Sequence, residues 1–170
     1  MNYLKITKTD VANGKGVRVV LWLSGCTLHC KGCHNYESWD FTAGKKFDDA
    51  AKEELFNALS KAHIDGITFS GGHPLEYAIA RDVYELIKEI KEKFPNKSIW
   101  LYTGLTWEML MTSSKESYRY KIISMCDVII DGSYIEGMRD LTLKFRGSSN
   151  QRIIDVKKSL SSNEIILYDK

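Results

Sequence analysis

The sequence predicts an α/β fold, a shortened and open (β/α) partial TIM barrel built as one domain. Stretches rich in β-branched and aromatic residues alternate with amphipathic helical segments, an order that favours a mainly parallel sheet. The chain has 170 residues, whereas a complete eight-fold barrel takes about 250. Because no internal repeat, low-complexity stretch or convincing linker divides the chain, we expect a single domain over residues 1–170.

The first half of the chain contains two predicted strands, each followed by a loop and a helix. Residues 17–23 read as a buried strand that runs into Ser24 and Gly25. Asp48 and Asp49 favour a helix start, and the helix that follows repeats its apolar residues on one face, at Leu55, Ala58, Leu59 and Ala62. The second strand, residues 66–70, ends where two glycines and a proline prevent its continuation.

The second half repeats this order with less regular spacing. An amphipathic helix over residues 79–94 carries its apolar face at Ile79, Val83, Leu86, Ile87, Ile90 and Phe94. Residues 98–102 and 127–131 predict two more strands, separated by a segment over 106–125 that is helical in pieces. Residues 141–145 and 152–155 are candidates for short strands in the tail. In a parallel sheet the functional loops follow the carboxyl ends of the strands.

Neither the net charge nor the apolar pattern indicates a nucleic-acid or membrane partner, although local charged patches remain possible. There are 24 Lys and Arg against 22 Asp and Glu, so no excess of positive charge indicates a nucleic-acid partner. The longest strongly apolar stretch, residues 17–23, is interrupted by Arg18 and is far shorter than the roughly 18 to 20 residues of a membrane span. The N-terminal residues lack the features of a secretory signal, and we therefore expect a cytoplasmic protein with no membrane partner.

Three of the four cysteines lie close together, in a loop directly after the first predicted strand. Cys26, Cys30 and Cys33 have the spacing CxxxCxxC, and three thiolates can hold three irons of a 4Fe-4S cluster while one iron stays open to another ligand. Two alternatives remain open: a structural zinc site completed by His29 or His34, as in a binding module without catalysis, and a redox pair of Cys30 and Cys33. Zinc modules usually bind the metal with two ligand pairs that a longer stretch of sequence separates, and a redox pair leaves Cys26 unexplained.

The other polar groups at the predicted strand ends are less specific. Gly71 and Gly72 would face the cysteine loop in a parallel fold and let the backbone approach a ligand, although alone they are typical of an ordinary turn. Thr103 ends the third strand, where a hydroxyl often caps a helix. Cys126 is expected to be a small buried hydrophobe, and His63 to be structural or solvated.

The cysteine spacing, followed by an aromatic-type residue at His34, resembles the signature loop of the radical S-adenosylmethionine (SAM) superfamily. The resemblance implies a partial barrel of the radical SAM type. It further implies that SAM binds the open iron and that one electron from the cluster splits SAM into methionine and a 5′-deoxyadenosyl radical. It also implies SAM contacts at Gly32, Cys33, His34, Gly71, Gly72, His73 and Thr103. The family usually has an acidic residue at the position of His73. A protonated imidazole there would repel the SAM ammonium, so we expect SAM binding to weaken on acidification.

Five stretches, residues 13–18, 24–35, 71–75, 100–104 and 145–151, resemble the small activating enzymes of anaerobic (class III) ribonucleotide reductase. This resemblance implies a glycyl radical formed near the C-terminus of the large catalytic subunit of the reductase. The electron would come from flavodoxin or ferredoxin, and no side chain need act as an acid or base. The alternatives within the class are an activase of another glycyl radical enzyme, such as pyruvate formate-lyase, and a small-molecule radical SAM enzyme. Residues 145–150 argue against both, because the generic superfamily motifs lack them.

Overall fold

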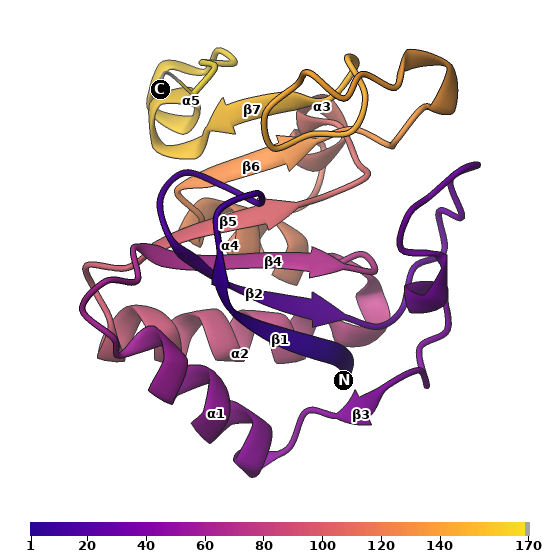
Figure 1. Cartoon of the computed structure of the whole chain (residues 1–170). Helices are drawn as coiled ribbons and strands as arrows, with labels where there is room; N and C mark the ends of the chain where they lie inside the picture. The colour runs from indigo at the N-terminus through magenta and orange to yellow at the C-terminus, as the bar shows by residue number, and fades with distance from the viewer. Residues whose placement is uncertain (169–170) are drawn as a thin grey trace.

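The computed structural model describes residues 1–168, which form one open, seven-stranded mixed sheet with helices packed against it (Figure 1). The strand order is β3-β1-β2-β4-β5-β6-β7. The strands are β1 (Asn2–Asp10), β2 (Arg18–Leu23), β3 (Lys45–Lys46), β4 (Gly66–Gly71), β5 (Ser98–Tyr102), β6 (Val128–Asp131) and β7 (Arg152–Asp155). The α/β class predicted from the sequence is therefore confirmed.

Four neighbouring strands in the middle of the sheet, β2, β4, β5 and β6, are parallel, and one register line runs through Val20, Thr68, Trp100 and Val128. The strands β1, β3 and β7 pair antiparallel at the two sides. In Figure 1 the arrowheads of the parallel strands point to one edge, where the purple loop after β2 and the orange segment after β6 also lie. The loops with the predicted functional residues thus meet at one edge of the sheet.

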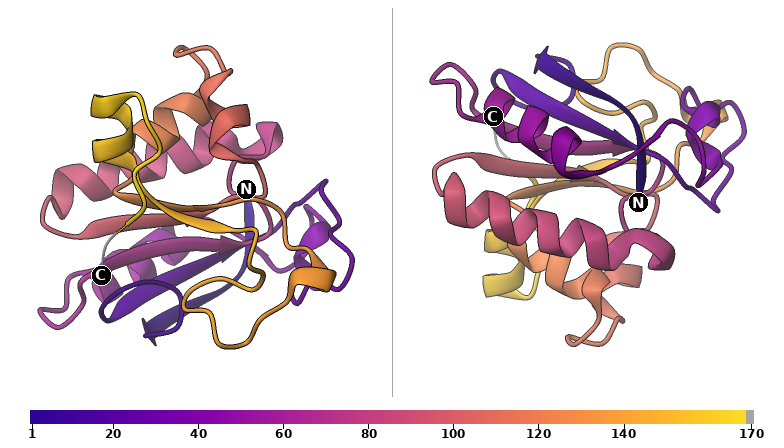
Figure 2. Two further views of the ribbon diagram at one scale, coloured as in Figure 1. Left: turned by 90° about the horizontal axis from the view of Figure 1, so that it is seen from above. Right: turned by 90° about the horizontal axis from the view of Figure 1, so that it is seen from below.

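All five α-helices of residues 1–168 contribute buried side chains to one core on a single face of the sheet. Figure 2 shows the α-helices on this side and the orange segment after β6 on the other. The helices are α1 (Asp49–Leu59), α2 (Tyr77–Lys93), α3 (Trp107–Met111), α4 (Tyr118–Met125) and α5 (Val156–Ser162), with short 3-10 turns η1 (Tyr36–Trp39) and η2 (Glu136–Met138). Within the described residues, no helix combines the length and apolarity that crossing a bilayer requires.

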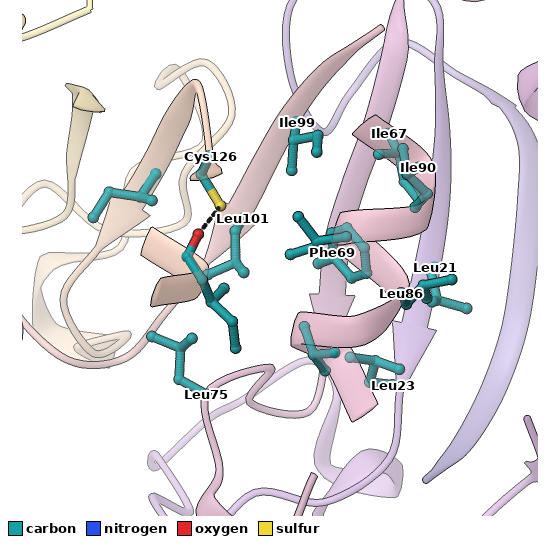
Figure 3. Close-up of a cluster of buried hydrophobic side chains, with 14 of the residues drawn as sticks. Leu21, Leu23, Ile67, Phe69, Leu75, Leu86, Ile90, Ile99, Leu101 and Cys126 are labelled. Carbon is teal, nitrogen blue, oxygen red and sulfur yellow. Dashed lines mark hydrogen bonds between the residues drawn. The ribbon is translucent and has the colours of Figure 1, made fainter. Parts of the chain in front are cut away.

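The two faces of the sheet use alternate positions of the same strands, as the pleat requires. Odd-numbered side chains such as Leu21, Phe69 and Leu101 pack under the helices in the large core (Figure 3). Cys126 lies in this core and its Sγ donates to the carbonyl of Ile122 at 3.2 Å, so the prediction of a small buried hydrophobe is confirmed. The opposite face holds a smaller cluster around Trp100, Val128 and Ile130, covered by loops.

Arg18 explains why the stretch before β2 is folded against the sheet. The side chain is only 1% exposed, and its guanidinium donates to the Thr68 hydroxyl at 2.8 Å and to the carbonyls of Ile67 at 2.8 Å and Ser98 at 2.9 Å. It also donates to Lys15 O at 3.0 Å, within the loop that leads into β2. Burial lowers its pKa to about 10, so the group stays charged while it joins three parallel strands near their amino ends.

The structure corrects one strand prediction and adds elements that were not predicted. Residues 141–145 form turns, because Asp140 Oδ1 accepts from the Thr142 backbone N–H at 2.9 Å and from its hydroxyl, and Leu141 is left 84% exposed. The second tail candidate is confirmed as β7. The segment over residues 106–125 is helical in pieces as predicted and forms α3 and α4, whereas β1, β3 and α5 had not been predicted.

Candidate functional site

The cysteine loop (residues 24–35) leaves the carboxyl end of β2 and is held at its base by backbone hydrogen bonds. The N–H of Gly25 donates to Ser38 O at 2.6 Å, and that of Cys26 donates to Trp39 O at 3.2 Å. Gly25 has a φ of 109°, and a Cβ there would lie 2.3 Å from the ring of Phe41, so only glycine fits this first turn. The loop therefore departs from the sheet edge in a defined direction.

The three cysteines predicted to bind iron, Cys26, Cys30 and Cys33, are unpaired thiols of intermediate exposure. Burial raises the pKa of Cys26, while backbone N–H groups of Leu28 and His29 favour its thiolate. Cys33 Sγ accepts from the Asn35 N–H at 3.4 Å. Such N–H donors stabilise the anionic sulfur that a metal ligand must provide.

Among residues 1–168, no group of three or more His, Cys, Asp or Glu side chains is arranged to hold a single metal ion. A cubane gives each cysteine its own iron, so its ligands need not converge on one point. Three free thiols in one accessible loop, with N–H donors toward two of the sulfurs, therefore fit a cubane by the chemistry of their donor set.

Gly71, the last residue of β4, and Gly72 lie directly against the cysteine loop. The N–H of Gly72 donates to Leu23 O at 2.7 Å, and the N–H of His73 donates to Gly25 O at 2.8 Å. A Cβ on Gly71 would lie 2.6 Å from the backbone of Leu23, and one on Gly72 would lie 2.5 Å from Gly25 O. The two loops thus join backbone to backbone, with no space for a side chain between them.

Behind this junction, His73 and Glu76 are buried together, at 2% and 5% exposure. His73 Nδ1 lies 3.4 Å from Glu76 Oε1, and His73 Nε2 lies 2.8 Å from the Thr103 hydroxyl after β5. Burial lowers the pKa of His73 despite the nearby carboxylate, so the ring is neutral near pH 7. Both ring nitrogens are therefore engaged by the protein itself.

A cavity of about 430 Å³ lies on the helix-free face of the sheet, next to the cysteine loop. Of the predicted site residues, Cys33 and His34 line it, whereas Cys26, Cys30, Gly32, Gly71, Gly72, His73 and Thr103 do not. Its walls combine aromatic rings with polar and cationic groups, among them Trp22, Asn35, Ser70, Tyr102, Tyr134, Phe145, Arg139 and Arg146. A volume of this size is typical of small-molecule sites.

Sequence reasoning missed several of these wall residues, although part of the signal was present. Trp22, Ser70 and Tyr102 occupy even-numbered positions of predicted strands, and Ser70 and Tyr102 directly precede the predicted residues Gly71 and Thr103. Because successive side chains of a strand point to opposite faces, the alternation could have identified them. Tyr134 comes from an irregular loop, where no periodic pattern exists.

The segment over residues 145–151 forms a self-closed loop at the cavity wall. Gln151 Oε1 accepts from the N–H groups of Gly147 at 3.0 Å and Ser148 at 3.2 Å, and its Nε2 donates to Gly132 O at 3.0 Å. Asn150 donates to Ser133 O at 2.8 Å, and the Tyr102 hydroxyl donates to Phe145 O. These bonds anchor the loop to the carboxyl ends of β5 and β6 and so hold the wall in place.

Comparison with known proteins identifies the family. A family model described as "4Fe-4S single cluster domain" matches residues 12–154. A relative from Haemophilus influenzae named anaerobic ribonucleoside-triphosphate reductase-activating protein is 40% identical over 155 residues, which cover 90% of this chain and 97% of the relative. The chain belongs to the family of these activating proteins. Proteins of the same name from Enterobacteria phage T4 (38% identical; 90% of this chain, 93% of the relative) and Escherichia coli K12 (33%; 89% and 96%) also match.

Membership in this activating-protein family decides between the metals considered above. The matched 4Fe-4S domain spans the cysteine loop, so the metal centre of the family is an iron–sulfur cluster and the zinc module is excluded. The matched range also includes the cavity-wall loop over residues 145–151. The site and its wall therefore lie within the range that the family model matches.

Proposed function

We propose that this protein is a radical SAM activating enzyme that generates a glycyl radical on the large catalytic subunit of anaerobic ribonucleotide reductase. When bound, the cluster supplies the electron that splits SAM into methionine and a 5′-deoxyadenosyl radical, which takes a hydrogen atom from a reductase glycine. The observation that carries this proposal is the cysteine loop beside a cavity, in a chain whose relatives are named for activating that reductase.

In this proposal Cys26, Cys30 and Cys33 hold the cluster. Their intermediate exposure and the N–H donors near two of the sulfurs support the assignment. The loop gives these thiols a common setting at the carboxyl end of β2, so each can take one iron. The protein contributes ligands and their orientation, and none of its side chains serves as an acid or base.

SAM would occupy the cavity next to Cys33 and His34 and extend beyond its lining to the backbone of Gly32, Gly71 and Gly72, with further contacts from His73 and Thr103. Among residues 1–168, none donates a hydrogen bond to the carbonyl of Gly72, so this oxygen is free to accept one from the SAM ammonium. Aromatic walls such as Tyr102 and Phe145 offer surfaces for adenine. The His73 ring already has two protein partners, so its own contact would require a backbone atom or a rearranged side chain.

We further propose that the sheet is a partial TIM barrel of the radical SAM type, formed by one domain over residues 1–170. Support comes from four parallel strands adjacent in chain order, with all five α-helices of residues 1–168 on one face. The open face would admit the glycine-bearing segment of the reductase, which then completes the wall and limits access of water. Flavodoxin or ferredoxin is the proposed electron donor.

The experiment that tests this function has two stages. Anaerobic reconstitution with iron and sulfide should yield cubane absorption, and dithionite should then produce 5′-deoxyadenosine from SAM. Incubation with anaerobic ribonucleotide reductase should next give a glycyl radical signal in electron paramagnetic resonance, with pyruvate formate-lyase as the comparison target. A signal on pyruvate formate-lyase alone would reassign the target, and absence of SAM cleavage by the cluster-loaded protein would refute the activity.

A further inference from the structure

Glu76, the residue before helix α2, holds the cysteine loop from the neighbouring strand end. Its Oε1 accepts from the backbone N–H of Thr27 at 2.8 Å and from the Thr27 hydroxyl at 2.9 Å. Among the described residues, these are the only hydrogen bonds that join residues 27–32 to any part of the chain outside the cysteine loop. The carboxylate thus restrains the turn that directly follows Cys26.

His73 orients that carboxylate through a directional set of hydrogen bonds. The Glu76 carboxylate can only accept, so the neutral His73 ring carries its proton on Nδ1, which lies 3.4 Å from Glu76 Oε1. His73 Nε2 then accepts from the Thr103 hydroxyl at 2.8 Å, and the hydroxyl oxygen accepts from the Leu105 N–H at 3.1 Å. The loops after β2, β4 and β5 are therefore connected through one buried carboxylate and one imidazole.

We propose that Glu76 is a positioning residue for the cluster-binding loop, with His73 as the group that orients it. The inference deepens the proposed function and rests on it for the assignment of Cys26 as an iron ligand. The Glu76 carboxylate is directed at Thr27, and Glu76 does not line the cavity.

The physical reason lies in what the loop would lose. Without the carboxylate, the Thr27 N–H and the His73 Nδ1–H lack their acceptor, and hydrogen bonds to a charged group are stronger than neutral ones. The turn after Cys26 would then sample more conformations and hold its iron less persistently. Stability of the remaining fold depends mainly on the separate core between the sheet and the helices.

The test measures how fast a chelator removes iron from the reconstituted holoprotein, followed by loss of cluster absorption. Glu76→Ala should accelerate the loss about tenfold or more, as expected for one charge-assisted bond. Glu76→Gln keeps an oxygen acceptor for Thr27 and should stay within about threefold of the wild type. Ile90→Val, a buried truncation near the other end of the same helix, is the control: it should lower the unfolding midpoint while iron loss stays at the wild-type rate.

Equal iron retention by Glu76→Ala and the wild type would overturn the positioning role. If Ile90→Val lost iron as fast as Glu76→Ala, global stability would explain both rates, and the positioning role would again be overturned. The same holds if Glu76→Gln lost iron as fast as Glu76→Ala. Failure of the proposed function gives a different result, in which Cys30→Ala assembles the same cluster as the wild type or the wild type assembles no cluster. Either result would also remove the basis for the positioning role.

Discussion

The junction between the cysteine loop and the glycine pair should be intolerant of even one added methyl group. In Gly72→Ala, the new Cβ would lie 2.5 Å from Gly25 O and 3.0 Å from Gly25 N, both rigid backbone atoms. Overpacking of this kind costs about 1–3 kcal/mol. Separation of the loops also weakens the bonds from Gly72 N to Leu23 O and from His73 N to Gly25 O, each worth about 0.5–1.5 kcal/mol. We expect a total loss of about 2–6 kcal/mol.

Gly137→Ala is the matched control, because a Cβ at that position would meet no heavy atom of residues 1–168 within 4 Å beyond its chain neighbours. Its free energy of unfolding should stay within about 0.5 kcal/mol of the wild type. Urea titrations of the three proteins under anaerobic conditions, followed by far-ultraviolet circular dichroism, give the comparison. If the two alanine variants unfold at the same urea concentration, the steric reasoning about the junction is wrong.

Three further outcomes are expected. Cys30→Ala should abolish cubane absorption after reconstitution, whereas Cys126→Ala should retain this absorption and lose about 1 kcal/mol of stability. Loss of the cluster in both variants would contradict the assignment of Cys30 as an iron ligand. Burial lowers the pKa of His73, against the pull of Glu76 and with the help of Arg119, so the unfolded chain binds the proton more readily. Stability from His73 should therefore be complete above about pH 6.5 and fall as the pH drops below it, and His73→Asn should flatten the urea midpoints between about pH 8 and 5.5. Arg152→Ala should lower the free energy of unfolding, measured by heat or urea, by about 2–4 kcal/mol, because the Asp131 carboxylate, 1% exposed, loses the guanidinium that lies 2.6 Å away. Glu108→Gln, at the exposed end of the same ion-pair network, should lower it by less than about 1 kcal/mol.

The sequence predicted the central sheet well because its parallel strands are buried on both faces. Strands such as β4 and β6 are short apolar runs that end at glycine, and both were located to within one residue. Strand β1 pairs antiparallel beside them and carries exposed or half-buried polar residues along most of its length, so it lacks that signature. Helix α5 has only 7 residues, too few for a clear helical period.

The wrong strand at residues 141–145 has a local cause. Leu141, Leu143 and Phe145 alternate as in a strand, but the carboxylate of Asp140 bonds to Thr142 and favours a turn. Hydrogen bonding by a short polar side chain therefore outweighed the apolar pattern.

Within the site, spacing located the residues that are close in sequence and missed those brought together by the fold. The cysteine trio and His34 follow from one short motif. The contact between Glu76 and Thr27 joins positions 49 residues apart, and no local pattern reports it. The orientation of His73 likewise depends on Thr103, a partner 30 residues away on another strand end.

Odd and even positions of the parallel strands contact different parts of the protein, and this affects which substitutions the fold tolerates. Side chains such as Leu21, Phe69 and Leu101 secure the helices, while Trp22, Ser70 and Tyr102, one position away on the same strands, face the ligand space. Substitutions at the second set can change the shape and polarity of the pocket without disturbing the first. One scaffold can therefore acquire new ligand preferences at little cost to folding.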